Sequence, residues 1–345
     1  MARHITVVGG GIVGLSCAWE LVRRGVAVTL IESDRPGAGS SGGTVGALAP
    51  HAPENWNAKK QLQLDALVGA DAWWGAVAAA GGGDPGYART GRVQPVAADA
   101  VARMRARAAA AADIWPAPFR MDLTAAPTGP LVPDSPSGLW LTDTLTARLS
   151  PRRAVAALAA AIGAAGCEII GRAGPQHPDR LRGAVIWATG ADGLLALGHD
   201  LGRAVGGGVK GQSALLGFAA PDAPQVFVDG LHIVPHSDGT TAVGSTSERD
   251  VADLGTDGQL DALIDRAREL CPALRDAAVV DRWAGIRPRA LSRAPLIGVW
   301  PGRPGHLVAN GGFKIGFAMA PVMAAMVADL VTGGPDRIPD DFRMR

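Results

Sequence analysis

The chain has 345 residues, of which 48% are hydrophobic and 19% charged, and its formal net charge is +1. This composition excludes a disordered, fibrous or disulfide-stapled protein and predicts a globular chain of about two domains. The 33 basic and 32 acidic residues balance and form no long Lys/Arg run, so nucleic acid is not an expected partner. Three scattered cysteines form no metal-binding or disulfide pattern, which predicts no metal site and a cytoplasmic location.

The N-terminal residues alternate between strand-like and helix-like patterns. Ile5 to Val8 is a β-prone run, a helix pattern extends from Ile12 to Arg24, and Val26 to Ile31 is a second β-prone run. Gly25 stands where the helix needs a left-handed C-terminal residue. The segment therefore predicts a βαβ unit.

The middle of the chain leaves this pattern and returns to it. A loop of small residues covers 36–50, a helix is expected over 61–80, and glycines at 81–86 indicate a domain boundary. Ser150-Pro151 predicts the start of another helix, with proline at its first position. A buried strand at 185–190 then runs into a glycine turn, which indicates that the first domain is continued after an excursion.

The last third of the chain carries β-hairpin signals. Strands are expected at 232–236 and 241–245 around a turn at 237–239, and they indicate an antiparallel sheet over about 206–301. A strand at His306 to Ala309 and a helix over Phe317 to Val331 close the chain. We expect no transmembrane segment, because this final apolar run is short and contains Asp329.

A dinucleotide-binding motif lies in the first turn. Gly9-Gly10-Gly11-Ile12-Val13-Gly14 fits G-x-G-x-x-G between the first strand and helix, and Glu32 closes the second strand. In this motif Gly9 allows the tight turn, Gly11 lets the backbone approach a pyrophosphate, and Gly14 lets the helix pack closely on the strand. The helix N-terminus then faces the phosphates. A carboxylate at Glu32 accepts hydrogen bonds from an adenosine ribose and disfavours a 2′-phosphate, so FAD or NAD is favoured over NADP.

Further segments extend this pattern along the whole chain. They are Val7 to Glu32; Ser40-Ser41-Gly42-Gly43-Thr44-Val45-Gly46-Ala47-Leu48-Ala49-Pro50; Ala188-Thr189-Gly190; Trp283 to Pro288 with Pro295 to Gly298; and Asn310 to Gly316 with Ala320-Pro321. In these segments the chain resembles the FAD-dependent D-amino acid oxidase superfamily, most closely its glycine oxidase and sarcosine oxidase branch.

The resemblance implies an α/β fold in which a Rossmann-type FAD-binding domain is joined to a discontinuous second domain built on an antiparallel sheet. We expect residues 1–80, 150–205 and 301–345 in the FAD-binding domain, and residues 81–149 and 206–300 in the substrate-binding domain. Two departures from the family are visible. Tyr87 is the only tyrosine, and the segment Gly171 to Gly183 is shorter than its counterpart in relatives.

The resemblance also implies where FAD would bind. The loop Ser40 to Pro50 would run beside the flavin and the pyrophosphate, and backbone N–H groups at Gly312 to Gly316 would stabilise negative charge on the reduced ring. No cysteine is found near Arg287, where sarcosine oxidases attach flavin, and His51 lies downstream of the family's attachment histidine, so non-covalent FAD is expected. The expected contacts are Gly9, Gly11, Ile12, Val13, Gly14, Glu32, Ser33, Ser40, Ser41, Gly42, Gly43, Gly46, Ala47, Leu48, Ala188, Thr189, Gly190, Gly311, Gly312, Phe313, Lys314 and Ile315.

Three residues are implied for the substrate site. Arg287 matches the family arginine that clamps the substrate carboxylate, and Lys314 matches a second cation after the last glycine turn; both chemistries suit an anion. His232 stands where glycine oxidases often have tyrosine. His236 lies on the same strand face, which either lines the pocket or faces solvent.

The implied function is FAD-dependent oxidation of the C–N bond of a small amino acid or secondary amine, such as glycine, a D-amino acid or sarcosine. Hydride transfer to flavin N5 would give an imine that hydrolyses, with O2 or another acceptor reoxidising the flavin and H2O2 as the expected product with O2. Three alternatives stay open: a flavin dehydrogenase of another amine or hydroxy acid, a non-catalytic FAD-binding subunit, and an NAD-dependent dehydrogenase. The sequence leaves the substrate and the oligomeric state undetermined, and a homo-oligomer is compatible with it.

Overall fold

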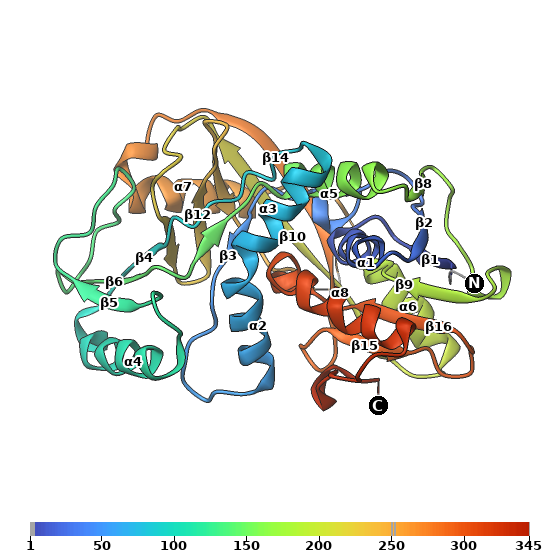
Figure 1. Cartoon of the computed structure of the whole chain (residues 1–345). Coiled ribbons are helices and arrows are strands. Elements are labelled where there is room, and N and C mark those ends of the chain that lie inside the picture. Colours follow the sequence, from blue (N-terminus) through green and yellow to red (C-terminus); the bar gives the residue numbers. More distant parts are fainter. Residues whose placement is uncertain (1–3, 250, 252, 345) are drawn as a thin grey trace.

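The computed structural model describes residues 4–249, 251 and 253–344, and two large sheets organise this part of the chain (Figure 1). The first sheet has six strands in the order β15 (Leu296–Val299), β16 (His306–Asn310), β9 (Ala184–Trp187), β1 (His4–Val8), β2 (Ala27–Ile31) and β8 (Glu168–Ile170). Neighbouring strands are parallel, except that β15 and β16 are antiparallel. This mostly parallel sheet confirms the expected α/β class.

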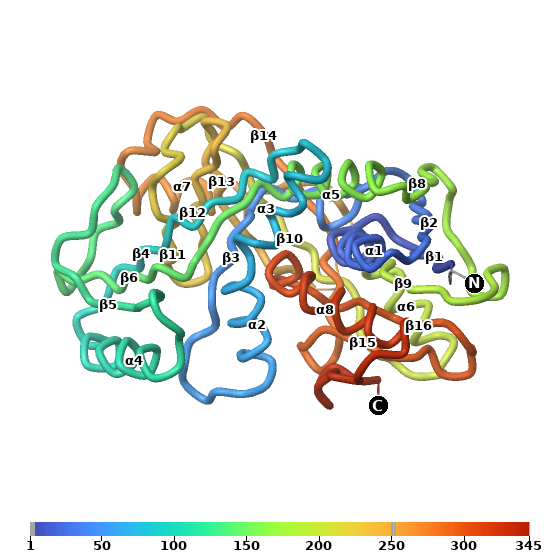
Figure 2. Tube along the Cα trace, in the orientation of Figure 1, coloured from blue at the N-terminus to red at the C-terminus, as the bar shows by residue number. Residues whose placement is uncertain are grey.

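Helices cover both faces of the six-stranded sheet. Side chains alternate between the faces of β1, so that Ile5 and Val7 join one hydrophobic core and Val8 joins another. The first core also contains α1 (Ile12–Arg23), α5 (Pro151–Ala164) and α8 (Gly316–Thr332), and the second contains α6 (Gly190–Asp200). Figure 2 shows α8, near the red end of the chain, lying beside the blue α1, so the two ends of the sequence build one layer.

The second sheet has eight strands and lies on the left in Figure 1. A third core lies between this sheet and α7 (Gly258–Leu270), while α4 (Val101–Ile114) packs on the outer strand β5. A small two-stranded sheet, β3 (Ala47–Leu48) with β7 (Ala147–Arg148), is separate. The order of the eight strands is β14 (Val279–Ala290), β10 (Gly206–Leu216), β13 (Thr241–Gly244), β12 (Leu231–Pro235), β11 (Gln225–Val228), β4 (Arg92–Pro95), β6 (Trp140–Asp143) and β5 (Met121–Thr124).

Most expected elements are present near their expected bounds. The βαβ unit is β1-α1-β2, Gly25 has a φ of 74° after α1, and Pro151 is the first residue of α5. The hairpin β12-β13 is antiparallel with Pro235 opposite Thr241. The prediction is therefore confirmed where periodicity and turn residues agree.

Two boundaries differ from the expectation. The single helix expected over 61–80 is two helices, α2 (Ala58–Val68) and α3 (Ala70–Gly81), which meet at Gly69; Asn57 begins α2 by accepting a hydrogen bond from the Lys60 amide. The strand β15 lies within the range expected for the substrate-binding domain, but it pairs with β16 in the six-stranded sheet. A β-prone run does not show which sheet it will join, because strand pairing is a tertiary choice.

The C-terminal helical segment is longer than the expected apolar run. Residues Phe313–Thr332 are long and apolar enough to cross a membrane by those two criteria. More than half of this window is buried inside the protein, where α8 packs on α1 and α2. Core helices pass the same test, so the segment is weak evidence for a membrane span.

Candidate functional site

The two glycine turns that the sequence singled out meet at one edge of the six-stranded sheet. The strands β1, β9 and β16 are parallel neighbours, so the turns that follow them lie together. The side chain of Asn310 donates a hydrogen bond of 2.8 Å to the carbonyl of Gly190, and a Cβ at Gly312 would lie 3.9 Å from Val13. The first and last parts of the chain therefore border one site, at the carboxyl ends of the strands, where open α/β sheets bind ligands.

The first turn depends on two glycines. Gly9 has a φ of 108°, a left-handed conformation that side chains disfavour. A Cβ at Gly14 would lie 1.9 Å from the carbonyl oxygen of Gly9, which is much closer than any real contact. Gly14 therefore lets α1 begin directly against the end of β1, and the helix N-terminus reaches the site.

Side chains from neighbouring segments hold this turn in place. Glu32 accepts a hydrogen bond of 2.5 Å from the Gly10 amide through Oε2, and its Oε1 accepts bonds of 3.0 Å from the Ser33 hydroxyl and the Asp34 amide. Ser41 Oγ accepts the Ile12 amide at 2.9 Å, at the start of α1. The turn is thus preorganised by the chain itself, and Oε2 of Glu32 keeps a lone pair for a ribose hydroxyl.

Two cavities of about 410 Å³ each lie along this edge. We call the cavity that is lined by Glu32 and Thr189 the nucleotide cavity, and the cavity that is lined by His232 and Arg287 the inner cavity. They share Ile12, Ser40, Ser41, Phe313 and Gly316, so they form one continuous groove. The shared residues include the start of α1, where a diphosphate would meet the positive end of the helix dipole.

Most residues expected to contact the cofactor line this groove. The nucleotide cavity is lined by Gly9, Gly11, Ile12, Val13, Glu32, Ser33, Ser40, Ser41, Ala188, Thr189, Gly190, Gly312 and Phe313. The inner cavity adds Gly43, Ala47, Lys314 and Ile315.

Five residues of that expectation are not among the lining residues: Gly14, Gly42, Gly46, Leu48 and Gly311. Packing explains the three that are most enclosed. Gly14 faces the Gly9 carbonyl, a Cβ at Gly46 would lie 1.8 Å from the Leu149 carbonyl oxygen, and Leu48 is in the hydrophobic core. Small or apolar residues beside a ligand loop can serve the loop's path rather than the ligand, and the sequence does not separate these roles.

Arg287 lies in the inner cavity as a buried cation. It comes from β14, it is 9% exposed, and its Nη1 donates a hydrogen bond of 3.1 Å to the carbonyl of Thr246. Burial lowers the pKa of Arg287 to about 10, although the charge of Glu248 opposes this shift. Within the described residues no carboxylate is within ion-pair distance of its guanidinium, which leaves donors for an anionic ligand.

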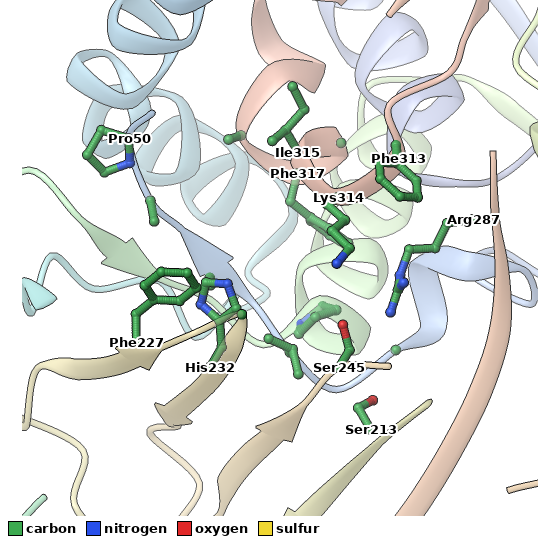
Figure 3. Close-up of a pocket in the computed structure, with 18 of the residues that line it drawn as sticks. Pro50, Ser213, Phe227, His232, Ser245, Arg287, Phe313, Lys314, Ile315 and Phe317 are labelled. Carbon is green, nitrogen blue, oxygen red and sulfur yellow. The ribbon is translucent and has the colours of Figure 1, made fainter. Parts of the chain in front are cut away.

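Lys314 follows the last glycine turn and shares the cavity with Arg287. The residue is exposed overall, but partial desolvation of its ammonium group and the neighbouring Arg287 charge lower its pKa from the usual value. Figure 3 shows the two side chains pointing toward the same space, with Ser245 below it. Two cations that have no acidic partner among the described residues therefore face one region of the cavity.

His232 also lines the inner cavity, where its ring lies 4.7 Å from that of Phe227 (Figure 3). Burial, with the charges of Arg92 and Lys314, lowers the pKa of His232 to about 3, so the ring is neutral at physiological pH. Its Nδ1 has no hydrogen-bond partner in the described part of the chain. His236 is buried but is not among the lining residues, which separates the two histidines.

A polar network supports Arg287 from behind. The Thr246 hydroxyl donates a hydrogen bond of 2.5 Å to Glu248, and Gln212 donates through its side chain to the same carboxylate at 3.0 Å. Lys210, buried on β10, lies 3.7 Å from the other oxygen of Glu248. This network fixes the carbonyl that holds Arg287.

The sequence reading missed part of the lining. The loop after β8 contributes Gly174, Pro175, Gln176 and Pro178 to the nucleotide cavity, whereas the sequence indicates only that this loop is short. Arg92 and Gln94 reach the inner cavity from β4. Their alternate spacing on one strand is a signal that shared-face reasoning could have used.

The residues along the groove suit the successive parts of FAD. Glu32 at one end can bind the ribose, the start of α1 in the middle can bind the diphosphate, and the inner cavity can take the ring beside Lys314. The cation at Lys314 and the backbone turn 312–316 suit a ring edge that becomes negative on reduction.

Comparison with known proteins agrees with this geometry. A glycine oxidase of Pseudomonas putida is 28% identical over 96% of this chain and 95% of its own, and a Rhizobium etli protein named as a thiamine biosynthesis oxidoreductase, ThiO, is 31% identical over 97% and 99%. A glycine oxidase of Pseudomonas aeruginosa is 37% identical, but the alignment spans only 36% of this chain and 35% of that protein. The crystal structure of glycine oxidase from Geobacillus kaustophilus has a TM-score of 0.85, with 23% identity and 99% of both chains covered.

Residues 4–330 match the family described as DAO, FAD dependent oxidoreductase. The chain therefore belongs to the DAO family of FAD-dependent oxidoreductases.

Proposed function

We propose that this flavoenzyme oxidises the C–N bond of a small α-amino acid or N-substituted α-amino acid, of the glycine, D-amino acid or sarcosine type. The observation that carries the proposal is Arg287, a buried guanidinium that faces the inner cavity without an acidic partner among the described residues. A planar carboxylate can accept two parallel hydrogen bonds from a guanidinium. The relatives named glycine oxidase support the same class of substrate.

The chain's own residues would position the substrate and set its charge. Arg287 would hold the carboxylate, and Lys314 would add positive potential from the other side of the same space. Because the described lining residues of the inner cavity include no Asp or Glu, a protonated substrate amine would be disfavoured there. The substrate would therefore bind with a neutral amine, which is the form that can lose a hydride from Cα.

His232 would act as a neutral hydrogen-bonding group rather than a cation, since its pKa is about 3. FAD, when bound, would supply the two-electron oxidation, in which the Cα–H bond breaks and its hydrogen leaves the substrate as a hydride. The substrate would leave as an imine, which water hydrolyses to an oxo acid and an amine. O2 is the proposed final electron acceptor, giving H2O2, because two of the named relatives are glycine oxidases.

Purified holoenzyme with glycine, sarcosine and D-alanine tests the proposal. Anaerobic mixing is expected to bleach the flavin absorbance, and aerobic turnover is expected to consume O2 and release H2O2. Arg287→Ala is expected to raise KM for these carboxylates by about 100-fold or more while FAD stays bound. Bleaching without O2 consumption would instead support a dehydrogenase, and a flavin that no amino acid, amine or hydroxy acid bleaches would overturn the proposed oxidation.

Amines that lack a carboxylate provide the control. If Arg287 binds the carboxylate, Arg287→Ala should change KM for a simple alkylamine much less than for sarcosine. An equal loss for both classes would remove Arg287 from the carboxylate site.

A further inference from the structure

We infer that the inner cavity contains a second anion-binding subsite at Arg92, so that the preferred substrate is an amino acid that carries a second acidic group. This inference deepens the proposed function and rests on it. It concerns the part of the cavity built by β4, β11 and β12, apart from Arg287 on β14.

Arg92 is held in a fixed orientation from behind. It is 7% exposed, and its Nε donates a hydrogen bond of 2.9 Å to Asp143 on the adjacent strand β6. Asp143 is itself fixed, because its other oxygen accepts the Thr146 amide at 2.8 Å. Asp143 therefore engages the Nε edge of the guanidinium, and the Nη atoms make no hydrogen bond to any residue that the structure describes.

The surroundings of Arg92 suit a bound acidic group. Gln94 lies two residues along β4, so both side chains are on one face of the strand, and both line the cavity. The Arg92 guanidinium lies 5.9 Å from the Phe227 ring, which restricts its motion on one side. The neutral His232 ring lies tilted against Phe227, at an interplanar angle of 47°, and adds a hydrogen-bonding group without charge.

Arg92 and Lys314 act on His232 together. Both cations lower the pKa of this histidine, which places His232 within electrostatic range of the two. A ligand that contacts Arg287 and Lys314 by one acidic group could thus extend past His232 to Arg92. The described lining residues connect these positions in one cavity.

Charge balance favours two acidic groups over one. Arg92 is paired with Asp143, and Arg107 at the same cavity is paired with Glu54 at 2.7 Å. Arg287 and Lys314 have no acidic partner among the described residues, so they contribute two uncompensated positive charges. A ligand with two acidic groups therefore brings the net charge of the described lining residues and their partners to zero, and its second group can bond to the Nη atoms of Arg92 that Asp143 leaves free.

Pairs of isosteric substrates test this inference. N-(ω-carboxyalkyl)glycines with one to three methylene groups would be compared with the matching carboxamides, which have the same shape without the charge. D-Aspartate with D-asparagine, and D-glutamate with D-glutamine, would show whether the second acid is carried on nitrogen or on Cα. In the wild-type holoenzyme we expect kcat/KM for the best diacid to exceed that of its amide by at least about tenfold.

Two variants locate the effect. Arg92→Lys keeps a charge for Asp143 but removes the guanidinium fork, and Gln94→Glu adds a negative charge while leaving the Arg92-Asp143 pair intact. Each is expected to reduce the diacid-to-amide ratio toward one. Arg282→Lys is the matched control, because Arg282 pairs with Asp261 outside the cavity, and its ratio should equal that of the wild type.

A binding measurement gives a second readout. Glutarate and butyrate differ by one terminal carboxylate, and their dissociation constants can be obtained from the perturbation of the flavin spectrum. Glutarate is expected to bind at least about tenfold more tightly than butyrate in the wild type, and Arg92→Lys should abolish the difference.

The outcomes separate the two proposals. If the enzyme oxidises glycine or sarcosine but the diacid-to-amide ratio of kcat/KM is near one, the subsite is overturned and the proposed function is retained. The same holds if Arg92→Lys and Gln94→Glu leave that ratio unchanged. Failure of every amino acid to bleach the flavin would overturn the proposed function itself. If Arg92→Lys loses FAD or unfolds, Gln94→Glu and the wild-type ratios still decide.

Discussion

The guanidinium of Arg287 lies directly against the backbone of Gly211 on the neighbouring strand. A Cβ at Gly211 would be 1.8 Å from Nη2 and 2.1 Å from Cζ of Arg287. The two long strands β10 and β14 pair throughout this region, with Gly211 opposite Gly285 and Val209 opposite Arg287. The position of the cation therefore depends on the absence of a side chain across the ladder.

Gly211→Ala should displace Arg287 without disturbing the cofactor. The methyl group collides with the end of a flexible side chain rather than with backbone, so the fold should persist while the guanidinium moves. We expect KM for a carboxylate substrate to rise by about tenfold or more, because a displacement of about 1 Å is costly in a positioned site. Steady-state kinetics and the flavin-to-protein absorbance ratio measure both effects, and an unchanged KM would show that Arg287 does not bind substrate.

Carboxylate affinity should fall at alkaline pH because of Lys314. Its pKa lies below the usual 10.5, so deprotonation removes a positive charge from the cavity as the pH rises through the lowered value. Binding of butyrate, which has no amine to titrate, should weaken as the pH rises from 7 to about 9, below the pKa of about 10 at which Arg287 would also lose its charge. Flavin spectral titrations would detect this. Lys314→Met should remove the pH dependence, whereas Lys59→Met on α2, outside the cavity lining, should keep it.

Glu248→Gln should destabilise the protein at neutral pH and much less in acid. Burial opposes ionisation of Glu248, but hydrogen bonds from Thr246 and Gln212 and the charge of Lys210 hold its pKa below the usual 4.5. A carboxyl whose folded pKa is lowered stabilises the native state above its unfolded pKa, and this contribution is lost as pH falls through the folded pKa. We expect a loss of about 1 to 3 kcal/mol near pH 7 from the weakened partner of buried Lys210.

Thermal unfolding of the wild type and Glu248→Gln as a function of pH measures this contribution. The difference in Tm should be fully developed above pH 4.5 and shrink below it. Asp265→Asn provides a control, since Asp265 pairs with Arg268 on the exposed face of α7. A Tm difference that stays constant into acid would contradict a role for ionised Glu248.

Gly14→Ala should prevent normal FAD binding. The new methyl group would meet the backbone carbonyl of Gly9, so α1 would have to move away from β1 and carry its N-terminus out of the groove. The purified variant should retain less than about a tenth of the flavin of the wild type, by its visible spectrum. Gly75→Ala on α3 is the matched control: nothing lies within 4 Å of a Cβ there, so flavin content should be unchanged and stability slightly higher.

Local sequence patterns predicted much of the fold. The β1-α1-β2 unit, the start of α5 at Pro151 and the hairpin around 237–239 each combine periodicity with a turn or cap residue, and all three are present. The split between α2 and α3 at Gly69 was missed, because the apolar spacing continues across it. The membership of β15 was missed for a different reason, since pairing with β16 depends on a partner that follows in sequence.

In the candidate site, too, some residues could be assigned from the sequence and others could not. Gly9, Gly11 and Glu32 could be assigned from spacing alone, because the motif and the ligand-facing turn are contiguous in sequence. Arg92 could not, because its spacing with Gln94 shows only that the two share one face of β4, and the folded chain alone shows that this face lines the same cavity as Arg287.

The sequence by itself determined a dinucleotide-binding βαβ unit, because strand, turn and helix signals are local, and its resemblance to a known family singled out Arg287 and Lys314. Only the tertiary structure decided which charges remain without partners. Arg92 and Arg287 are equally basic as residues, but Asp143 pairs with one and no described carboxylate pairs with the other. That difference arises from side chains distant in sequence that are brought together by sheet pairing, and it sets the charge of the cavity in which the proposed chemistry takes place.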